Sequence, residues 1–372
     1  PAEKFQVGGF QFGWNPDGEN GPVIEITCGE KTLWSSVPGE PFVAFARARS
    51  TVAESRGFFD IQDDRLPYTE VQTLDTIAGG ADGVTLAGRL EGRDNVGWCL
   101  RLVAMDDVQL QMNIAIDHQL YGEKRVRLCH ACTPSDRVFG FGAQFTHVNL
   151  RGRWVDVLSQ EPGIGRGVQP LTWFMNTAFG AGGDDTRSNA PAPHYVTSSA
   201  QSLCLENHEL SRFDLRHDDR IEVEVWSDNV SLRIFAGETP ADHIEAYTRF
   251  CGRMLPLPDW MQQGAVVGMQ GGTDAARSMW TTLKEVDAPV AAFWLQDWVG
   301  ARKTSVGSQL WWNWELDEAR YPGWEAFRTE LQSAGARILS YVNPFLVDVS
   351  EREESCGRNL FREAEEQGFL VR

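Results

Sequence analysis

The sequence has few basic residues for its length. Its 372 residues contain 34 Lys plus Arg against 52 Asp plus Glu, which gives a formal net charge of −18 at pH 7. It has no run of basic residues and no stripe of Lys and Arg along a helix. Because binding to a phosphate backbone requires clustered cations that release counterions, this balance excludes nucleic acid as a partner. The same argument excludes an anionic membrane surface.

Long hydrophobic runs are also missing. No apolar stretch approaches the roughly 20 residues that span a bilayer, and the N-terminal residues PAEKFQVGGFQFGW show no basic region followed by an apolar one. Apolar residues nevertheless make up 42% of the chain, and its length favours two domains or one large domain with an appendage. The sequence therefore predicts a globular protein with a cytoplasmic location and no membrane partner.

Cysteine is sparse and odd in number, with seven residues in all. This usage fits reduced thiols in the cytosol better than a disulfide scaffold. The one local pattern is Cys129-His130-Ala131-Cys132, and no second Cys or His pair follows at the spacing of a zinc site. We therefore predict a strand with two buried thiols, rather than a redox pair or half a metal site, and no metal or organic cofactor.

Alternation of apolar and polar residues dominates residues 1–237. The clearest example is Ile221–Val225 followed by Val230–Ile234, and the Ser-Asp-Asn cluster between them predicts a hairpin. Similar runs, separated by Gly, Asp and Asn, lie at residues 23–27, 98–103 and 108–116. Several short strands with turn signals between them predict an antiparallel β-sandwich domain over residues 1–237.

Residues 159–195 depart from this pattern. They contain the stretches SQEPGIGRGVQP and FGAGGDDTRSNAPAP, which are rich in Gly, Pro, Asn and Asp and have no periodicity. The composition predicts long loops, which either reach over a binding site or form a mobile surface.

Residues 238–260 predict a helical linker. Thr239 can cap a helix, Pro240 suits the first helical position and Asp242 stands at the third, so we expect a helix that ends at Gly252. The following segment Leu255–Trp260 contains two prolines, which break regular structure because each lacks an N–H donor.

Beyond residue 260, apolar strands alternate with amphipathic helices. We expect strands at 264–272, 290–298 and 336–346, and helices at 273–286, 324–334 and about 351–367. This alternation predicts a parallel sheet covered by helices. The segment 261–372 is much shorter than the roughly 250 residues of an eight-unit barrel, so the sheet is either an open one or the start of a truncated barrel.

Polar residues follow the predicted strands at their carboxyl ends: Gln270 the first, Gln296 and Asp297 the second, and Asn343 the third. Sites in parallel α/β folds lie at these ends. Eight of the 14 tryptophans fall between residues 260 and 324. Most of them are expected in the core, but indole rings beside amides suit the hydroxyls and C–H faces of a sugar. We therefore predict a sugar site that includes Gln270 and Gln296.

Hydrolysis of a glycoside requires a pair of carboxyl groups. Asp297 is the one acid at a predicted strand end, and Glu315 and Asp317 lie in the following loop. No defined spacing pairs these three, so the sequence assigns none of them as nucleophile or acid.

Several motifs together resemble glycoside hydrolase family 31, and within it the bacterial sulfoquinovosidases. The resemblance covers residues 138–372 and rests on PLPDW (256–260), GMQGGT (268–273), WLQDW (294–298), WWNW (311–314), YP (321–322) and YVNP (341–344), and upstream on GAQF (142–145) and LRG (150–152). Gln296-Asp297-Trp298 is the most specific part, because ordinary α-glucosidases have an Asp where Gln296 stands. Ala143 departs from the family Glu.

The resemblance implies a β-sandwich followed by a (β/α)8 TIM barrel and a retaining hydrolysis of α-glycosides of sulfoquinovose, a sugar substrate of the sulfoquinovosyl glycerol type. The family's two catalytic Asp residues lie on the fourth barrel strand and later. The sequence stops before that strand, so no catalytic residue is expected among these 372, and no hydrolysis if they are the whole protein. A homo-oligomer is left open.

The resemblance also implies that Gln270, Gln296 and Trp312 contact the sugar and its sulfonate. Gln309 stands where the family has an Arg. A neutral amide there removes a charge-assisted hydrogen bond of roughly 1.5 to 3 kcal/mol. Either Arg302 or Lys303 replaces this charge, or the pocket prefers a neutral sugar. The alternatives are therefore a neutral-sugar α-glucosidase or α-xylosidase and, from another class, a non-catalytic carbohydrate-binding protein.

Overall fold

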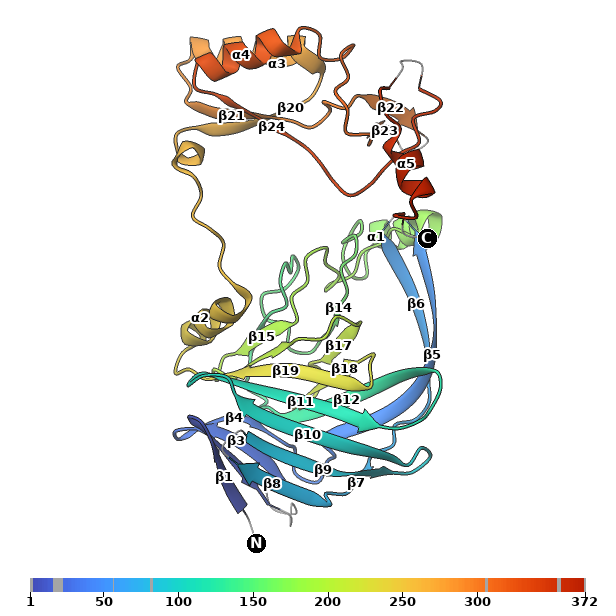
Figure 1. Ribbon diagram of the computed structural model, residues 1–372, viewed down its shortest axis with the longest axis vertical. Coiled ribbons are helices and arrows are strands. Elements are labelled where there is room, and N and C mark those ends of the chain that lie inside the picture. The colour runs from blue at the N-terminus through green and yellow to red at the C-terminus, as the bar shows by residue number, and fades with distance from the viewer. Residues whose placement is uncertain are drawn as a thin grey trace. The chain divides into compact units, whose positions relative to one another are not determined.

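The computed structural model describes residues 3–15, 23–55, 57–80, 83–304, 307–352 and 356–370. The chain divides into two compact units, residues 1–253 and 254–372. Strands predominate over helices (Figure 1). None of the helices in the described ranges is long and apolar enough to cross a membrane.

The first unit consists of strands and two helices. The helices are α1 (Pro170–Phe179) and α2 (Pro240–Cys251). The strands are β1 (Glu3–Val7), β2 (Phe10–Trp14), β3 (Ile24–Cys28), β4 (Lys31–Ser35), β5 (Val43–Ser55), β6 (Phe58–Arg65), β7 (Val71–Gln72), β8 (Thr76–Gly80), β9 (Gly83–Glu91), β10 (Val96–Ala104), β11 (Gln109–Asp117), β12 (Glu123–Ala131), β13 (Val138–Gly140), β14 (Trp154–Val157), β15 (His194–Thr197), β16 (Ser202–Leu205), β17 (Ser211–Asp214), β18 (Arg220–Val225) and β19 (Asn229–Phe235).

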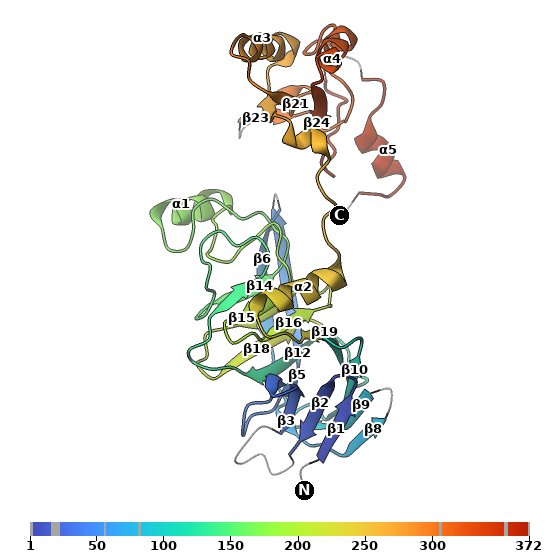
Figure 2. The same cartoon turned by 90° about the vertical axis from the view of Figure 1, so that its left-hand side faces the viewer.

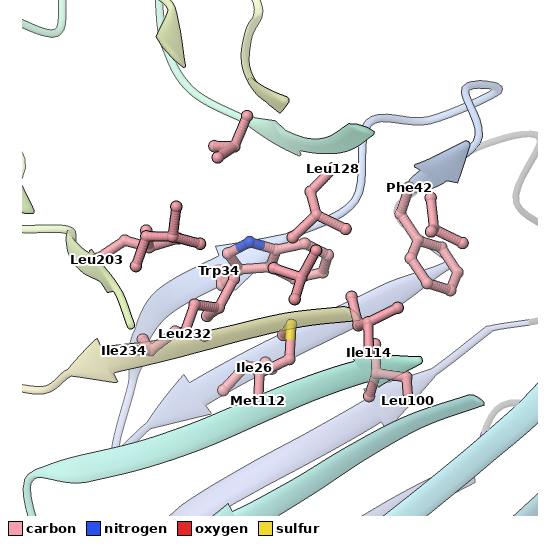
Figure 3. Packing of buried hydrophobic residues seen from close by; sticks show 14 of the residues in the cluster. Ile26, Trp34, Phe42, Leu100, Met112, Ile114, Leu128, Leu203, Leu232 and Ile234 are labelled. Carbon is pink, nitrogen blue, oxygen red and sulfur yellow. The ribbon is translucent and has the colours of Figure 1, made fainter. Parts of the chain in front are cut away.

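These strands form three antiparallel sheets around one hydrophobic core. Their orders are β1-β2-β3-β4, then β13-β15-β16-β19-β11-β10-β9-β7 with β8 also on β9, and β14-β17-β18-β12-β5-β6. Figure 3 shows side chains from all three sheets in this core: Ile26, Met112 and Leu128 each lie near Trp34. The predicted alternation holds in β10, where Trp98, Leu100 and Leu102 are buried and the residues between them are exposed.

The predicted hairpin over residues 221–234 is wrong, although both of its strands exist. β18 pairs with β12 and β17, whereas β19 pairs with β11 and β16 in a different sheet. The chain crosses between the sheets at residues 226–228, and the backbone there bonds to other segments, Trp226 N to Leu210 O and Ile116 N to Asp228 O. Period-two alternation gives each strand one buried face but does not say which strand lies beside it.

The prediction of loops throughout residues 159–195 missed the helix α1. Pro170 occupies its first turn and Gly180, at φ 62°, ends it. Only Thr172 of the helix is buried, so its apolar residues show no helical period. A Pro at the first helical position and a Gly just after the last one was the sequence pattern that could have predicted this helix. The flanking loops are held by Arg166, whose Nη1 donates to the carbonyl oxygens of Pro162, Asp184 and Arg187.

The helix expected from Thr239 and Asp242 is present as α2. The hydroxyl of Thr239 accepts from Asp242 N, and the Asp242 carboxylate accepts from Thr239 N. Ala246 of α2 packs against Cys204 and Phe235, so the helix lies on β16 and β19 within the first unit (Figure 2). The Leu255–Trp260 segment belongs to the second unit.

The second unit contains a parallel sheet in the order β20-β21-β24, as the alternation predicted. Trp280, Phe327 and Leu331 pack on Phe293 and Leu295, so α3 and α4 lie on one face of the sheet (Figure 1). The elements are the 3₁₀ turn η1 (Asp259–Gln262), β20 (Ala265–Met269), α3 (Gly272–Glu285), β21 (Val290–Leu295), β22 (Ala301–Thr304), β23 (Gly307–Leu310), α4 (Trp324–Ser333), β24 (Arg337–Ser340) and α5 (Leu360–Glu366).

Two features of this unit differ from what the sequence predicted. The antiparallel hairpin of β22 and β23 was not foreseen. The helix expected at 351–367 is shorter: α5 begins at Leu360, after Asn359 caps it by accepting from Arg362 N. Residues 353–355 of the predicted helix lie outside the described residues.

All seven cysteines are free. Cys129 lies in β12, where burial raises the pKa of its thiol to about 12. Cys132 follows the strand half-buried, and its Sγ accepts a hydrogen bond from Arg151 at 2.9 Å. A thiol whose pKa is raised carries little thiolate at neutral pH, so this pair lacks the electrostatics of a redox centre.

Two of the three buried histidines in the described part of the first unit, His130 and His194, make this unit sensitive to acid. The carbonyl oxygen of Ala131 can only accept, so His130 Nδ1 donates to it at 3.2 Å and neutral Nε2 accepts from the Tyr195 hydroxyl at 2.6 Å. His194 stacks on Tyr247, with ring centroids 3.8 Å apart. Burial lowers the pKa of each imidazole to about 4.

We expect the free energy of unfolding of the first unit to fall as the pH drops from about 6.5 to about 4. In that pH window the histidines of the unfolded chain bind protons, whereas those of the folded chain do not. Each histidine therefore lowers the free energy of unfolding by on the order of 3 kcal/mol. Below about pH 4 the folded histidines are protonated as well, so the free energy of unfolding stops falling on their account. Urea unfolding across this window, for wild type, His194→Phe and the exposed control His208→Gln, measures the slope. A slope that His194→Phe leaves unchanged would contradict the assignment.

Candidate functional site

Two predicted site residues, Gln270 and Gln296, meet at the carboxyl ends of β20 and β21. Gln270 Nε2 donates a hydrogen bond to Gln296 Oε1. The backbone supports the pair, since Gln296 N donates to Met269 O at 3.2 Å. Gln270 is exposed and Gln296 half-buried, so the pair retains donors and acceptors for a ligand.

Asp297, the residue after Gln296, holds the two strand ends together. Asp297 is 1% exposed. Oδ2 accepts from Gly271 N at 2.8 Å and from Arg320 Nε at 2.6 Å, and Oδ1 accepts from the Tyr321 hydroxyl at 2.5 Å. Burial and the Asp297 carboxylate raise the pKa of Tyr321 well above its usual value, so the phenol stays a neutral donor. Both oxygens of Asp297 are thus engaged in structural bonds.

Glu315 and Asp317, the two acids of the following loop named from the sequence, are also occupied. Both oxygens of Glu315 accept from Gly357 N, at 2.9 and 3.0 Å. Asp317 forms an ion pair with Arg352 at 2.9 Å and accepts from Arg320 N at 2.8 Å. Each of these three acids is thus engaged in hydrogen bonds or an ion pair within the unit.

A buried amide fixes the tryptophan-rich loop that follows β23. Asn313 is 2% exposed; its Nδ2 donates to Arg358 O at 2.8 Å and its Oδ1 accepts from Leu360 N at 3.0 Å. The next residue, Trp314, has φ 52°, which a bulky side chain rarely adopts. Such a conformation persists only where neighbouring interactions hold the backbone in place. The hydrogen bonds of Asn313 and Glu315, the residues on either side of Trp314, do this here.

Trp312 lies in the same loop, and its indole N–H makes no hydrogen bond to a described residue. Its indole ring lies 5.5 Å from that of Phe345 between centroids. Its Nε1 is buried and has no hydrogen-bond partner among the described residues. Gln309 lies in β23 directly opposite Arg302 of β22. No hydrogen bond between described residues joins Gln309 or Trp312 to the Gln270–Gln296 pair.

The roles of Arg320 and Tyr321, the two side chains that bind Asp297, were not predicted, although Tyr321 belongs to one of the family motifs. Both residues lie more than 20 positions after Asp297, and no periodicity relates them to a strand end. The role of Asn313, a residue of the WWNW motif, was not predicted either, because it depends on carbonyl and amide groups of a distant loop. Asn343, the third predicted strand-end amide, donates to the Tyr341 hydroxyl at 2.8 Å and accepts from Phe345 N.

One group of side chains in the first unit has the spacing of a metal site. The ligand atoms of Asp214, His217 and Glu222 lie within 4.8 Å of one another. Arginines already neutralise both carboxylates, Arg216 on Asp214 at 2.7 Å and Arg220 on Glu222 at 2.9 Å. This arrangement is that of an ion-pair network where β17 ends and β18 begins.

Comparison with known proteins identifies the family of the chain. No family model matches the chain. The sulfoquinovosidase of Agrobacterium fabrum is 31% identical over 325 residues, which are 86% of this chain and 46% of that protein. The sulfoquinovosidase of Escherichia coli is 28% identical over 300 residues, 78% of this chain and 43% of that protein.

A solved structure gives the same result. A family 31 (GH31) sulfoquinovosidase from E. rectale, in complex with an aza-sugar inhibitor, matches 93% of this chain and 50% of its own, with a TM-score of 0.81 at 27% identity. The chain spans about half the length of the relatives it matches. By sequence and by fold, it is a homologue of the sulfoquinovosidases of glycoside hydrolase family 31.

Proposed function

We propose that this chain is the substrate-recognising part of a retaining α-glycosidase that acts on α-glycosides of sulfoquinovose, such as sulfoquinovosyl glycerol. The observation that carries the proposal is the hydrogen-bonded pair Gln270–Gln296 at the carboxyl ends of neighbouring parallel strands. In barrels of parallel strands, ligands bind at these ends. The sulfoquinovosidase relatives support the choice of sugar.

The sheet of the second unit supports its assignment as the start of a (β/α)8 barrel, preceded by a β-sandwich. Phe293 and Leu295 pack under the helices. Side chains alternate along a strand, so Trp294 points to the opposite face, where it is 39% exposed, and Val266 of β20 is 41% exposed. Apolar side chains on both faces of a parallel sheet are typical of a barrel, whose interior is filled with them.

The catalytic carboxylates belong, in this proposal, to residues outside these 372. A retaining glycosidase requires two carboxyl groups about 5 to 5.5 Å apart. Asp297, Glu315 and Asp317 are each held by structural hydrogen bonds or an ion pair. No observation favours the neutral-sugar glycosidase or the non-catalytic binding protein. A cytoplasmic location and a homo-oligomer stay predictions.

The proposal predicts that the chain binds sulfoquinovose in preference to glucose and does not hydrolyse sulfoquinovosyl glycerol by itself. Gln296→Ala should weaken binding about three- to tenfold, because a neutral hydrogen bond contributes about 0.5 to 1.5 kcal/mol. Titration calorimetry with both sugars and an assay for released glycerol provide the test, with Gln332→Ala on the exposed surface of α4 as the control. Equal affinity for glucose would favour a neutral-sugar enzyme, and turnover by the chain alone would contradict the assignment of the acids.

A further inference from the structure

The six-stranded sheet of the first unit curls so far that its two outermost strands line one cavity. The sheet has the order β14-β17-β18-β12-β5-β6, so β14 and β6 lie at opposite ends of it. A cavity of about 370 Å³ is nevertheless lined by Asp156 of β14 and by Ile61 and Asp63 of β6. This volume is within the range of about 300 to 1,000 Å³ that is typical of small-molecule sites.

The concave face of this sheet, which carries Asp63, Asp156 and Arg212, is polar but nearly neutral. Four carboxylates line the cavity, and three of them are paired with guanidinium groups: Asp156 with Arg212 at 2.6 Å, Asp63 with Arg125 at 2.7 Å and Asp184 with Arg187 at 3.5 Å. Paired carboxylates and guanidiniums retain further lone pairs and N–H groups for a third partner. The lining therefore offers acceptors and donors without the excess charge that would select an ion.

Two buried polar atoms of the cavity lining make no hydrogen bond within the described residues. One is an acceptor, Gln160 Oε1, and the other is a donor, Arg187 Nε, whose 3.5 Å contact with Asp184 lacks hydrogen-bond geometry. Leaving such atoms unpaired costs free energy, so they indicate partners supplied by a ligand. A hydroxyl group both donates and accepts and can serve either atom, whereas a simple anion serves only the donor and a cation only the acceptor.

Apolar side chains supply much of the remaining lining. Phe59 and Ile61 come from β6, Leu158 follows β14, and Trp226 follows β18. Arg125 stacks on Trp226, with its guanidinium carbon 3.4 Å from the ring centroid, which restrains the indole. Aromatic and aliphatic surface beside hydroxyl-binding groups suits the C–H faces and hydroxyls of a sugar.

The cavity continues into two neighbouring hollows, so the site is elongated. One hollow, of about 350 Å³, shares Asp63 and Arg212 with the cavity, and the other, of about 370 Å³, shares Phe59 and Arg187. All three are lined by residues of the first unit alone. A groove of this form along one sheet face fits a chain of sugar units better than a single ring.

We propose that the concave face binds a neutral oligosaccharide. The lining and Arg125 together carry four carboxylates against three guanidinium groups, so an anionic sugar such as sulfoquinovose is not favoured there. Every residue on which the proposal depends belongs to the first unit. The proposal therefore does not rest on the function proposed for the Gln270–Gln296 pair.

Titration calorimetry of the whole chain with maltotriose and with cellotriose, two neutral trisaccharides of different linkage, tests this proposal. Gln160→Ala should weaken binding of the preferred trisaccharide about three- to tenfold, the effect of losing one neutral hydrogen bond. Leu158→Trp should abolish binding, because the larger side chain occupies the cavity. Gln62→Ala is the matched control, since Gln62 is exposed on the other face of β6. Gln296→Ala should leave trisaccharide binding unchanged.

Several results would overturn the proposal. One is a wild-type chain that binds neither trisaccharide, and another is wild-type affinity in a Leu158→Trp variant with a native circular dichroism spectrum. A loss of binding in Gln296→Ala but not in Gln160→Ala would assign the trisaccharide to the second unit and would also overturn it. Tighter binding of spermidine, a polycation, than of either trisaccharide would identify an acidic site in place of a sugar site.

Discussion

Replacement of Asp297 by Asn is expected to destabilise the second unit by about 1.5 to 3 kcal/mol, the contribution of a hydrogen bond to a charged group, because Asp297 is buried whereas the Arg320 side chain left without its anion is 36% exposed. Asp297 is 1% exposed, and its carboxylate accepts from Gly271 N, Arg320 and Tyr321. An Asn amide can accept through only one of its two terminal atoms, and its NH₂ group would face the donors that now meet Oδ2.

The same substitution should weaken sugar binding, because Asp297 positions both amides of the site. It follows Gln296 in sequence and holds Gly271, the residue after Gln270, at 2.8 Å. Urea unfolding followed by tryptophan fluorescence reports on this unit, which holds eight of the 14 tryptophans. Calorimetry with sulfoquinovose gives the second readout.

Asp287→Asn is the matched control for this measurement. Asp287 is an exposed carboxylate of the same unit at φ 50°, a conformation that Asn tolerates as well as Asp does. We expect a change within about 0.5 kcal/mol, the usual range for a surface substitution. If Asp297→Asn were as mild as this control, the three hydrogen bonds would contribute little to the fold, and Asp297 would again be a candidate for chemistry.

The meeting of Gln270 and Gln296 at the strand ends could be predicted from the sequence for a simple physical reason. Gln270 and Gln296 each follow an apolar strand, and the carboxyl ends of neighbouring parallel strands lie at one edge of the sheet. The role of Asp297 could not be predicted in this way. Its partners Arg320 and Tyr321 reach it through a loop of irregular structure, where no periodicity relates sequence position to contact.

Which strands pair with one another could not be predicted from the sequence either. The alternation in β18 and β19 correctly gave two strands with one buried face each, but their partners lie in two different sheets. The position of Arg302 opposite Gln309 likewise depends on the register of a hairpin that the sequence did not reveal. Alternation determines which face of a strand is buried, whereas neighbours follow from the path of the whole chain.

Gly272→Ala is the other substitution with a large expected effect, because the added methyl group would collide with the loop whose Arg320 binds Asp297. Gly272 begins α3 at φ 86°, and a Cβ there would lie 2.1 Å from the carbonyl oxygen of Arg320. The left-handed conformation alone costs a residue with a side chain about 1 to 2 kcal/mol. Relief of the backbone clash adds about 1 to 3 kcal/mol, the usual cost of overpacking.

Gly335→Ala separates these two contributions. Gly335 lies in the same unit at φ 83°, and a Cβ there would meet nothing within 4 Å. The two variants share the conformational cost, so the difference between their free energies of unfolding measures the clash with Arg320. Only Gly272→Ala should also weaken sulfoquinovose binding, because a displaced Arg320 backbone moves the guanidinium that fixes Asp297 and, through it, Gln296. Equal destabilisation by the two variants would mean that the loop before α4 moves away from the new methyl group without a loss of stability. The inference that Arg320 and Asp297 hold the strand ends rigidly would then be wrong.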